Sequence, residues 1–108
     1  MSALHEEHPH EYPKGTPPLD PDEARTLAEL IRDWTIESDR LTAELTFKDF
    51  QEAFSFVNRV ALLAEAEGHH PDISISWNRV KLEFWTHTAE GLTRNDFIMA
   101  AKIDRFRP

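Results

Sequence analysis

The chain has 108 residues, the usual size of one domain, and its 40% hydrophobic and 10% aromatic content is typical of a globular protein rather than a disordered one. Twelve Lys and Arg against twenty Asp and Glu give a formal net charge of −8, and the basic residues do not cluster. We therefore expect no direct binding to nucleic acid or to an anionic membrane. The absence of cysteine excludes disulfides, thiolate zinc sites and cysteine nucleophiles. With no secretory-type N-terminus and no apolar run of membrane-spanning length, a cytoplasmic location is the expectation.

Residues 1–18 are rich in His, Glu and Pro and have no apolar periodicity. This composition predicts a flexible arm outside the core. His5, His8 and His10 could hold a divalent metal, but a solvated tail is the simpler interpretation because ordering such a segment costs entropy. The folded domain is expected over 19–108.

A helix is predicted at the start of this domain. Asp20 suits the N-cap, Pro21 the first helical position and Glu23 the N3 position. Apolar residues then recur at helical spacing at Ala24, Leu27, Ala28 and Ile31. Together these features predict a helix over about 21–32.

A first hairpin and a long helix follow. Residues 34–36 look extended, 38–40 suit a turn, and strict alternation over 41–47 predicts a strand with one buried face. The period then changes to that of a helix over about 48–67, with Gly68 suited to the C′ position. The stripe expected to face the core is Phe50, Ala53, Phe54, Val57, Ala61 and Ala64.

A second hairpin and a last helix complete the chain. Apolar residues alternate with polar ones over 73–77 and 80–85, on either side of a turn at Asn78-Arg79. The run Thr93-Arg94-Asn95-Asp96 resembles a capping box and begins a helix that ends near residue 105. The order α-β-β-α-β-β-α predicts an α+β fold, a four-stranded antiparallel sheet with three helices on one face.

Outside the arm, every histidine falls in two short segments. His69 and His70 follow the long helix, and His87 follows the last strand, on the side away from the core. Imidazoles change charge near neutral pH, so three of them suggest proton transfer or metal binding. Glu65, four residues before His69, could orient that ring if the helix persists, and Asp96 is explained as the N3 residue of the capping box.

A zinc site made of these three imidazoles is chemically allowed. Adjacent histidines seldom reach one tetrahedral ion, however, and the sequence has no HExxH spacing. We therefore expect no metal.

Three motifs lie within this region of the sequence. They are Glu65-x-x-x-His69-His70-Pro71, Trp77-Asn78-x-Val80, and Thr86-His87-x-x-x-Gly91-Leu92-Thr93-x-x-Asp96. Taken together they resemble the pterin-4a-carbinolamine dehydratase family, and the likeness runs from about Trp34 to Ile103.

The resemblance implies an α+β enzyme that forms a homo-oligomer, a dimer or a tetramer. Such an enzyme removes water from 4a-hydroxytetrahydropterin to give quinonoid dihydropterin, recycling the pterin of aromatic amino acid hydroxylases without any further cofactor. By the same resemblance, one set of residues acts in the site. The catalytic members are His69, His70 and His87, the supporting carboxylates are Glu65 and Asp96, and the expected substrate contacts are Pro71, Thr86 and Trp77.

This dehydration needs a general acid for the departing hydroxyl and a base for a ring N–H proton. His69, beside the negative end of the helix dipole, is the expected acid, with His70 or His87 as the base. Two alternatives stay open. One is a non-catalytic pterin-binding or dimerisation/coactivator module of the same fold, and the other is a related dehydratase that acts on a different pterin.

Overall fold

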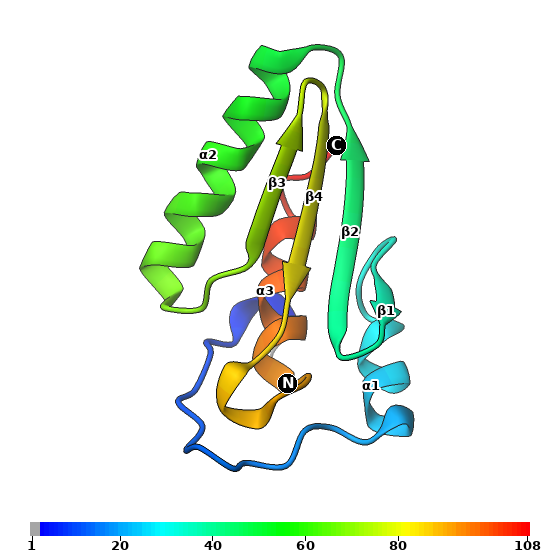
Figure 1. Cartoon of the computed structure of the whole chain (residues 1–108), viewed down its shortest axis with the longest axis vertical. Coiled ribbons are helices and arrows are strands. Elements are labelled where there is room, and N and C mark those ends of the chain that lie inside the picture. Colours follow the sequence, from blue (N-terminus) through cyan, green and yellow to red (C-terminus); the bar gives the residue numbers. More distant parts are fainter. Residues whose placement is uncertain (1–2) are drawn as a thin grey trace.

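A computed structural model describes residues 3–108 and confirms the α+β architecture (Figure 1). Four antiparallel strands lie in the order β1-β2-β4-β3. The strands are β1 (Thr35–Glu37), β2 (Arg40–Thr46), β3 (Asp72–Ser76) and β4 (Arg79–Phe84). The helices are α1 (Pro21–Ala28), α2 (Phe50–Glu67) and α3 (Arg94–Asp104), with short 3-10 turns η1 (Leu4–Glu6) and η2 (His87–Ala89). Within residues 3–108, no helix is both long and apolar enough to cross a membrane.

The core lies between the central strands β2 and β4 and the helices α2 and α3. The register places apolar residues opposite one another on the inner face of the sheet: Leu41 with Phe84, Ala43 with Leu82, and Leu45 with Val80. Helix α3 is buried along almost its whole length and supplies Phe97, Ile98, Met99 and Ile103, all fully buried. Arg94, at the start of α3, is exposed, but Asn95 and Asp96 of the same first turn lie inside the protein.

Local signals in the sequence set most of the helix ends. The Asp20 carboxylate accepts a hydrogen bond from the Glu23 amide at 2.8 Å, and Gly68 ends α2 with a left-handed φ of 72°. Helix α1 ends at Ala28, earlier than predicted, because the chain turns there and brings Trp34 into the core. The Trp34 indole then donates to the Asp104 carboxylate at 2.9 Å.

The predicted buried stripe of α2 was partly wrong. The side chains that face the sheet are Ala53, Phe56, Val60 and Ala64. Phe50 and Phe54 lie on the outer side of the helix and are 49% and 55% exposed. The aromatic-rich first half of α2 has two apolar sides, and only one of them can pack on the sheet.

The turn between β3 and β4 lies one residue earlier than predicted. Ser76 pairs with Arg79, so Trp77 and Asn78 form the turn, and Trp77 adopts a φ of 52°. The Asn78 side chain stabilises this turn by donating to the Phe47 carbonyl at 2.9 Å. Trp77 is consequently exposed at the tip of the hairpin.

The N-terminal segment differs from the predicted arm, of which Met1 and Ser2 lie outside the described residues. Leu4, on η1, is buried and belongs to the core cluster, so the expectation that this segment stays outside the core is wrong for Leu4. The Lys102 ammonium donates to the His5 carbonyl at 2.9 Å and fixes η1 beside α3. From η1 the chain runs around η2 to α1 (Figure 1).

We expect Leu4→Ala to lower the free energy of unfolding by about 1–3 kcal/mol, because it removes buried apolar contacts with the core. Leu30→Ala is the matched control, since Leu30 is 62% exposed, and it should change stability by less than about 0.5 kcal/mol. Urea unfolding followed by circular dichroism measures both. Equal effects would mean that η1 contributes nothing to the core.

Candidate active site

The end of α2 turns His69 toward the interior. Gly68 takes the left-handed conformation that ends the helix, and the next side chain packs its ring on Phe84, with the ring centres 5.9 Å apart and nearly parallel. The His69 side chain is only 13% exposed. Its Nε2 lies 2.7 Å from Oδ1 of Asp96, and because an ionised carboxylate can only accept, Nε2 is the donor.

Asp96 is fully buried, and each of its oxygens has a partner. While Oδ1 faces His69, Oδ2 accepts from the Thr93 amide and from the Thr86 hydroxyl, both at 2.9 Å. The Thr86 hydroxyl has one proton and gives it to Asp96, so in the 2.7 Å contact between the two threonines the Thr93 hydroxyl donates. A buried carboxylate is tolerated only when it is hydrogen-bonded or paired in this way.

The prediction that Asp96 is a helix cap was therefore incomplete. One oxygen does accept the Thr93 amide at the start of α3, as the capping pattern predicts. The other oxygen holds His69, which is distant in sequence and comes from the far end of α2. Asp96 thus joins the beginning of one helix to the imidazole that follows another.

The predicted partner of Glu65 was also wrong. Glu65 pairs with His70, whose Nε2 lies 2.5 Å from its Oε2, and not with His69. The helix does not persist beyond Gly68, so His69 turns inward and His70 is the residue left beside the last turn of α2. This pair is exposed, at 57% for the His70 side chain and 78% for Glu65.

His87 begins η2, three residues after the end of β4, and is exposed on the side away from the core, as expected. Its ring lies against Trp85, with 3.9 Å between the ring centres, and the Arg40 guanidinium covers the same indole. The Thr86 amide donates to the Gly91 carbonyl at 2.8 Å and closes the loop that carries His87. The turn that carries His87 is therefore fixed by a main-chain hydrogen bond.

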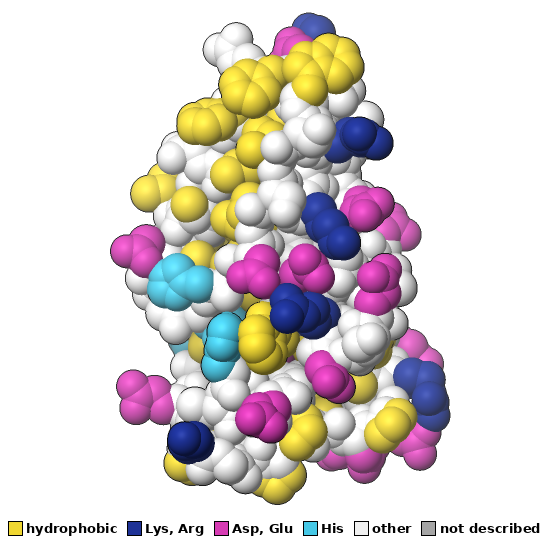
Figure 2. Space-filling model, viewed as in Figure 1, with side chains coloured by type: hydrophobic (Ala, Val, Ile, Leu, Met, Phe, Trp, Pro, Cys, Tyr) yellow, Lys and Arg dark blue, Asp and Glu magenta, His cyan; other side chains and the backbone are white. Residues whose placement is uncertain are grey.

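The three histidines line one cleft of about 660 Å³, within the size range of small-molecule sites. Figure 2 shows histidine side chains gathered below the C-terminal end of α2, beside the lower ends of β3 and β4. Of the other predicted site residues, Thr86 also lines the cleft, Asp96 lies behind His69, and Glu65 reaches it through His70. Pro71 follows His70 in the chain but is not among the lining residues.

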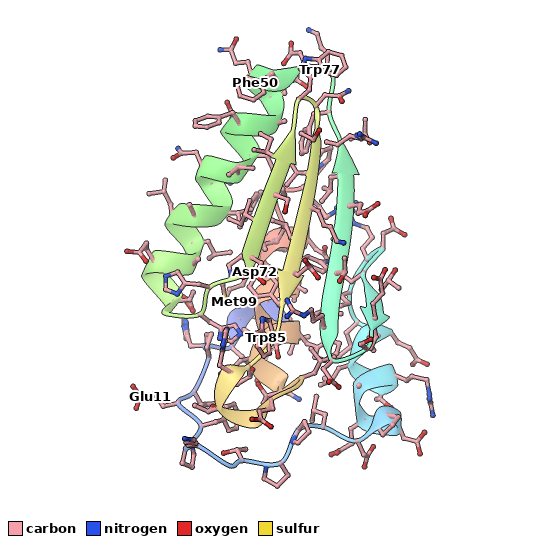
Figure 3. The ribbon with its side chains drawn as sticks, in the orientation of Figure 1. Glu11, Phe50, Asp72, Trp77, Trp85 and Met99 are labelled. Atoms are coloured by element: carbon pink, nitrogen blue, oxygen red, sulfur yellow. The ribbon has the colours of Figure 1, made fainter. Side chains whose placement is uncertain are left out.

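Trp77 was predicted to contact the substrate, but the structure does not bring it to this cleft. Figure 3 shows Trp77 and Phe50 at the same end of the molecule, whereas Trp85, whose ring lies against that of His87, is much lower. The motif that contains Trp77 forms the tip of the β3–β4 hairpin, and the length of the hairpin separates it from the site.

Several lining residues were not predicted. They are Pro9, His10, Glu11, Tyr12, Glu67, Gly68, Thr88 and Asn95. The N-terminal ones reach the cleft through long-range packing, for which the sequence has no periodic or motif signal. Asn95 lies beside a motif residue but has no recognisable pattern of its own.

No group of three or more potential metal-ligating side chains comes together anywhere in residues 3–108, the three histidines and the arm histidines included. Imidazoles, carboxylates and hydroxyls are among the side chains that line the cleft.

We expect Asp96→Asn to cost about 1–3 kcal/mol of stability, because the amide must place an N–H₂ group against either His69 or the donors of Thr86 and Thr93. The control is Asp49→Asn at the N-cap of α2, where the carboxylate accepts only the Glu52 amide. Asn caps about as well as Asp, so this change should cost less than about 0.5 kcal/mol. Chemical denaturation of both variants makes the comparison, and equal losses would reduce Asp96 to an ordinary cap.

Comparison with known proteins places the chain in a family. The family model described as pterin 4 alpha carbinolamine dehydratase matches residues 17–106. A relative from Alkaliphilus metalliredigens is 46% identical over 93 residues, covering 84% of each chain, and one from Chlorobium limicola is 51% identical over 89 residues, covering 79% of each. Both are assigned by name as pterin-4-alpha-carbinolamine dehydratases.

A solved structure from Brucella melitensis, named as a transcriptional coactivator/pterin dehydratase, superposes with a TM-score of 0.77 at 32% identity. The match covers 82% of this chain and 96% of that one. The sequence matches and the structural match extend over most of the chain. The chain therefore belongs to the pterin 4 alpha carbinolamine dehydratase family, whose members are hydro-lyases.

Proposed function

We propose that this protein dehydrates 4a-hydroxytetrahydropterin to quinonoid dihydropterin by histidine general acid–base catalysis, and so recycles the pterin of aromatic amino acid hydroxylases. One observation carries the proposal. The buried His69–Asp96 hydrogen bond forms the back of a cleft that two further imidazoles line. In a chain of this family, such a cleft supplies the groups that carbinolamine dehydration requires.

The proton balance of the reaction assigns the roles. The C4a–O bond breaks as the acid gives a proton to the hydroxyl, which leaves as water, while the base removes a ring N–H proton whose electrons form the new double bond. One proton is given and one is taken, so the enzyme needs neither oxidant nor reductant. Each well-placed group of this kind contributes roughly 10²–10⁴ in rate.

His69 fits the role of the acid. Its Nε2 is held by Asp96, so Nδ1 is the atom left to exchange a proton with the substrate. A positive charge on this imidazole sits opposite the buried carboxylate, and that pairing is far more favourable than an isolated buried charge. Thr86 and Thr93 then act as positioning residues, because they hold the carboxylate that holds His69.

The base is one of the two exposed imidazoles. His70 is oriented by Glu65, and His87 by its contact with Trp85. Both line the cleft from the side that solvent reaches, so either can pass a ring proton to water after each turnover. Glu65 is proposed as the positioning carboxylate of His70, and Pro71 as the residue that stiffens the chain behind it.

We expect His69→Ala and at least one of His70→Ala and His87→Ala to lower the rate of enzymatic dehydration by at least about tenfold, because each removes a proton-transfer group. Freshly generated 4a-hydroxytetrahydropterin, followed by its absorbance against the uncatalysed rate, provides the assay. His5→Ala is the matched control, since His5 is not among the residues that line the cleft. Circular dichroism should be unchanged in all four variants.

A non-catalytic role is the competing function, and it is favoured by the Brucella melitensis structure, whose name includes a transcriptional coactivator. In that case the cleft would bind a pterin, or the fold would serve as a dimerisation or coactivator module, without chemistry. Full rates in all three histidine variants, or no acceleration by the wild-type protein, would support this alternative. A second dehydratase alternative, a different pterin as substrate, is tested by offering pterins with different substituents in the same assay.

We also propose that the protein is a homo-oligomer. Strand β3 pairs only with β4 and leaves an open sheet edge, which proteins commonly cover or pair. The outer side of α2 presents Phe50, Phe54 and Leu62, and the exposed Trp77 lies at the same end of the molecule as Phe50 (Figure 3). Exposed apolar side chains that gather in this way are typical of a protein–protein contact.

Sedimentation at micromolar concentration should therefore give a mass above the 12.5 kDa of one chain. Phe54→Lys should shift the protein toward the monomer, because it places a charge in the apolar contact. Leu30→Lys is the control, since Leu30 is 62% exposed, against 55% for Phe54, but lies beyond the end of α1. A monomeric wild-type protein would contradict the proposal, and an oligomer unaffected by Phe54→Lys would contradict the use of α2.

A further inference from the structure

One wall of the cleft comes from outside the segment that the family model matches. The match begins at residue 17, yet Pro9, His10, Glu11 and Tyr12 line the cleft together with the three histidines. Glu11 contributes to the lining even though Figure 3 shows its side chain extending away from the body of the protein. Tyr12 is half-buried.

The Asn95 side chain fixes this N-terminal segment by hydrogen bonds to the main chain of His10. This side chain is 3% exposed, accepts from the His10 amide at 2.9 Å and donates to the His10 carbonyl at 2.6 Å. Both polar groups of a nearly buried amide are thus satisfied by the main chain of one residue. Loss of these hydrogen bonds would leave buried polar atoms without partners, so His10 is held firmly.

Further contacts hold the chain on either side of this point. Upstream, the Arg94 guanidinium donates twice to the Glu7 carboxylate, with both distances 2.7 Å, and this bidentate hydrogen bonding holds the pKa of Glu7 below its ordinary value. The Nδ1 atom of His8 lies 2.7 Å from Oε1 of Glu67. Downstream, the Gly15 amide donates to the Thr88 carbonyl at 2.9 Å.

These contacts use residues next to the proposed catalytic groups. Asn95 precedes Asp96, and Thr88 follows His87. Glu67 lies two residues before His69. The same loops and helix ends that place the imidazoles therefore also place the arm, and residues 9–12 have a defined position relative to the cleft.

We propose that the N-terminal arm is part of the substrate site, and that Tyr12 packs against a non-reacting part of the bound pterin and so sets affinity and selectivity. This inference rests on the proposed function, since it takes the pterin as the ligand. A flat bicyclic ring is well matched to a phenol ring, which offers apolar area with little entropy to lose on binding. A contact made equally in the ground state and the transition state changes KM and leaves kcat nearly unchanged.

We expect Tyr12→Ala to raise KM for 4a-hydroxytetrahydropterin about three- to tenfold, with kcat within about twofold of the wild type. Tyr12→Phe keeps the ring and should keep most of the affinity. Lys14→Ala is the matched control, an exposed residue of the same arm that is not among the lining residues. Thermal unfolding of each variant checks that the fold is intact.

Equilibrium binding gives a second readout that does not depend on turnover. A stable 7,8-dihydropterin, followed by its own fluorescence, should bind Tyr12→Ala more weakly by the same factor as the change in KM. Asn95→Leu removes the anchor of His10 and should reproduce this loss, and the double variant should be no worse than either single one. Additive losses would contradict a role of Asn95 in positioning the arm.

The outcomes separate the inference from the proposed function. Dehydration by the wild-type protein with unchanged KM and Kd in Tyr12→Ala would overturn the inference alone. A tenfold loss in kcat at constant KM would also overturn it, because Tyr12 would then act in the chemistry. A wild-type protein that neither dehydrates nor binds these pterins would overturn both.

Discussion

The fold and the site both depend on one buried carboxylate. Asp96 has no contact with solvent, so its charge has to be balanced by hydrogen bonds from within the protein. Those hydrogen bonds come from three separate segments: the residue before α3 (Thr93), the residue before η2 (Thr86) and the loop after α2 (His69). These segments come together through the packing of the sheet and both helices, so the packed fold is what places the first imidazole.

The packing around this carboxylate divides the three imidazoles into two kinds. His69 packs on Phe84, contacts Asp96 through Nε2 and lines the cleft. His70 and His87 stand at the rim, each held by a single neighbour and exposed to water. A largely enclosed group with a fixed charge partner and two solvated groups suit a reaction that gives a proton at one atom and takes one at another.

The sequence predicted those features that depend on neighbours in the chain. The cap at Asp20 and the helix end at Gly68 follow from local hydrogen bonds and backbone sterics, and motif spacing was enough to select the histidines. The predictions that were wrong concern features set by contacts between residues that lie far apart in the chain. The partner of His69 is decided by the inward turn after α2, and the exposure of Phe54 by which side of the helix the sheet covers. The docking of Leu4 depends on α3, nearly the whole chain away, and no local pattern encodes it.

The position of the proton on the His69 ring tests this arrangement most directly. Long-range ¹H–¹⁵N spectra of the labelled protein, recorded where this imidazole is neutral, distinguish the two tautomers. Because Nε2 donates to the Asp96 carboxylate, we expect a proton on Nε2 and a bare Nδ1 facing the cleft. We also expect this preference to be lost in Asp96→Asn. A wild-type ring protonated on Nδ1, with Nε2 bare, would contradict the proposed role of Asp96, since that ring could not donate to the buried carboxylate.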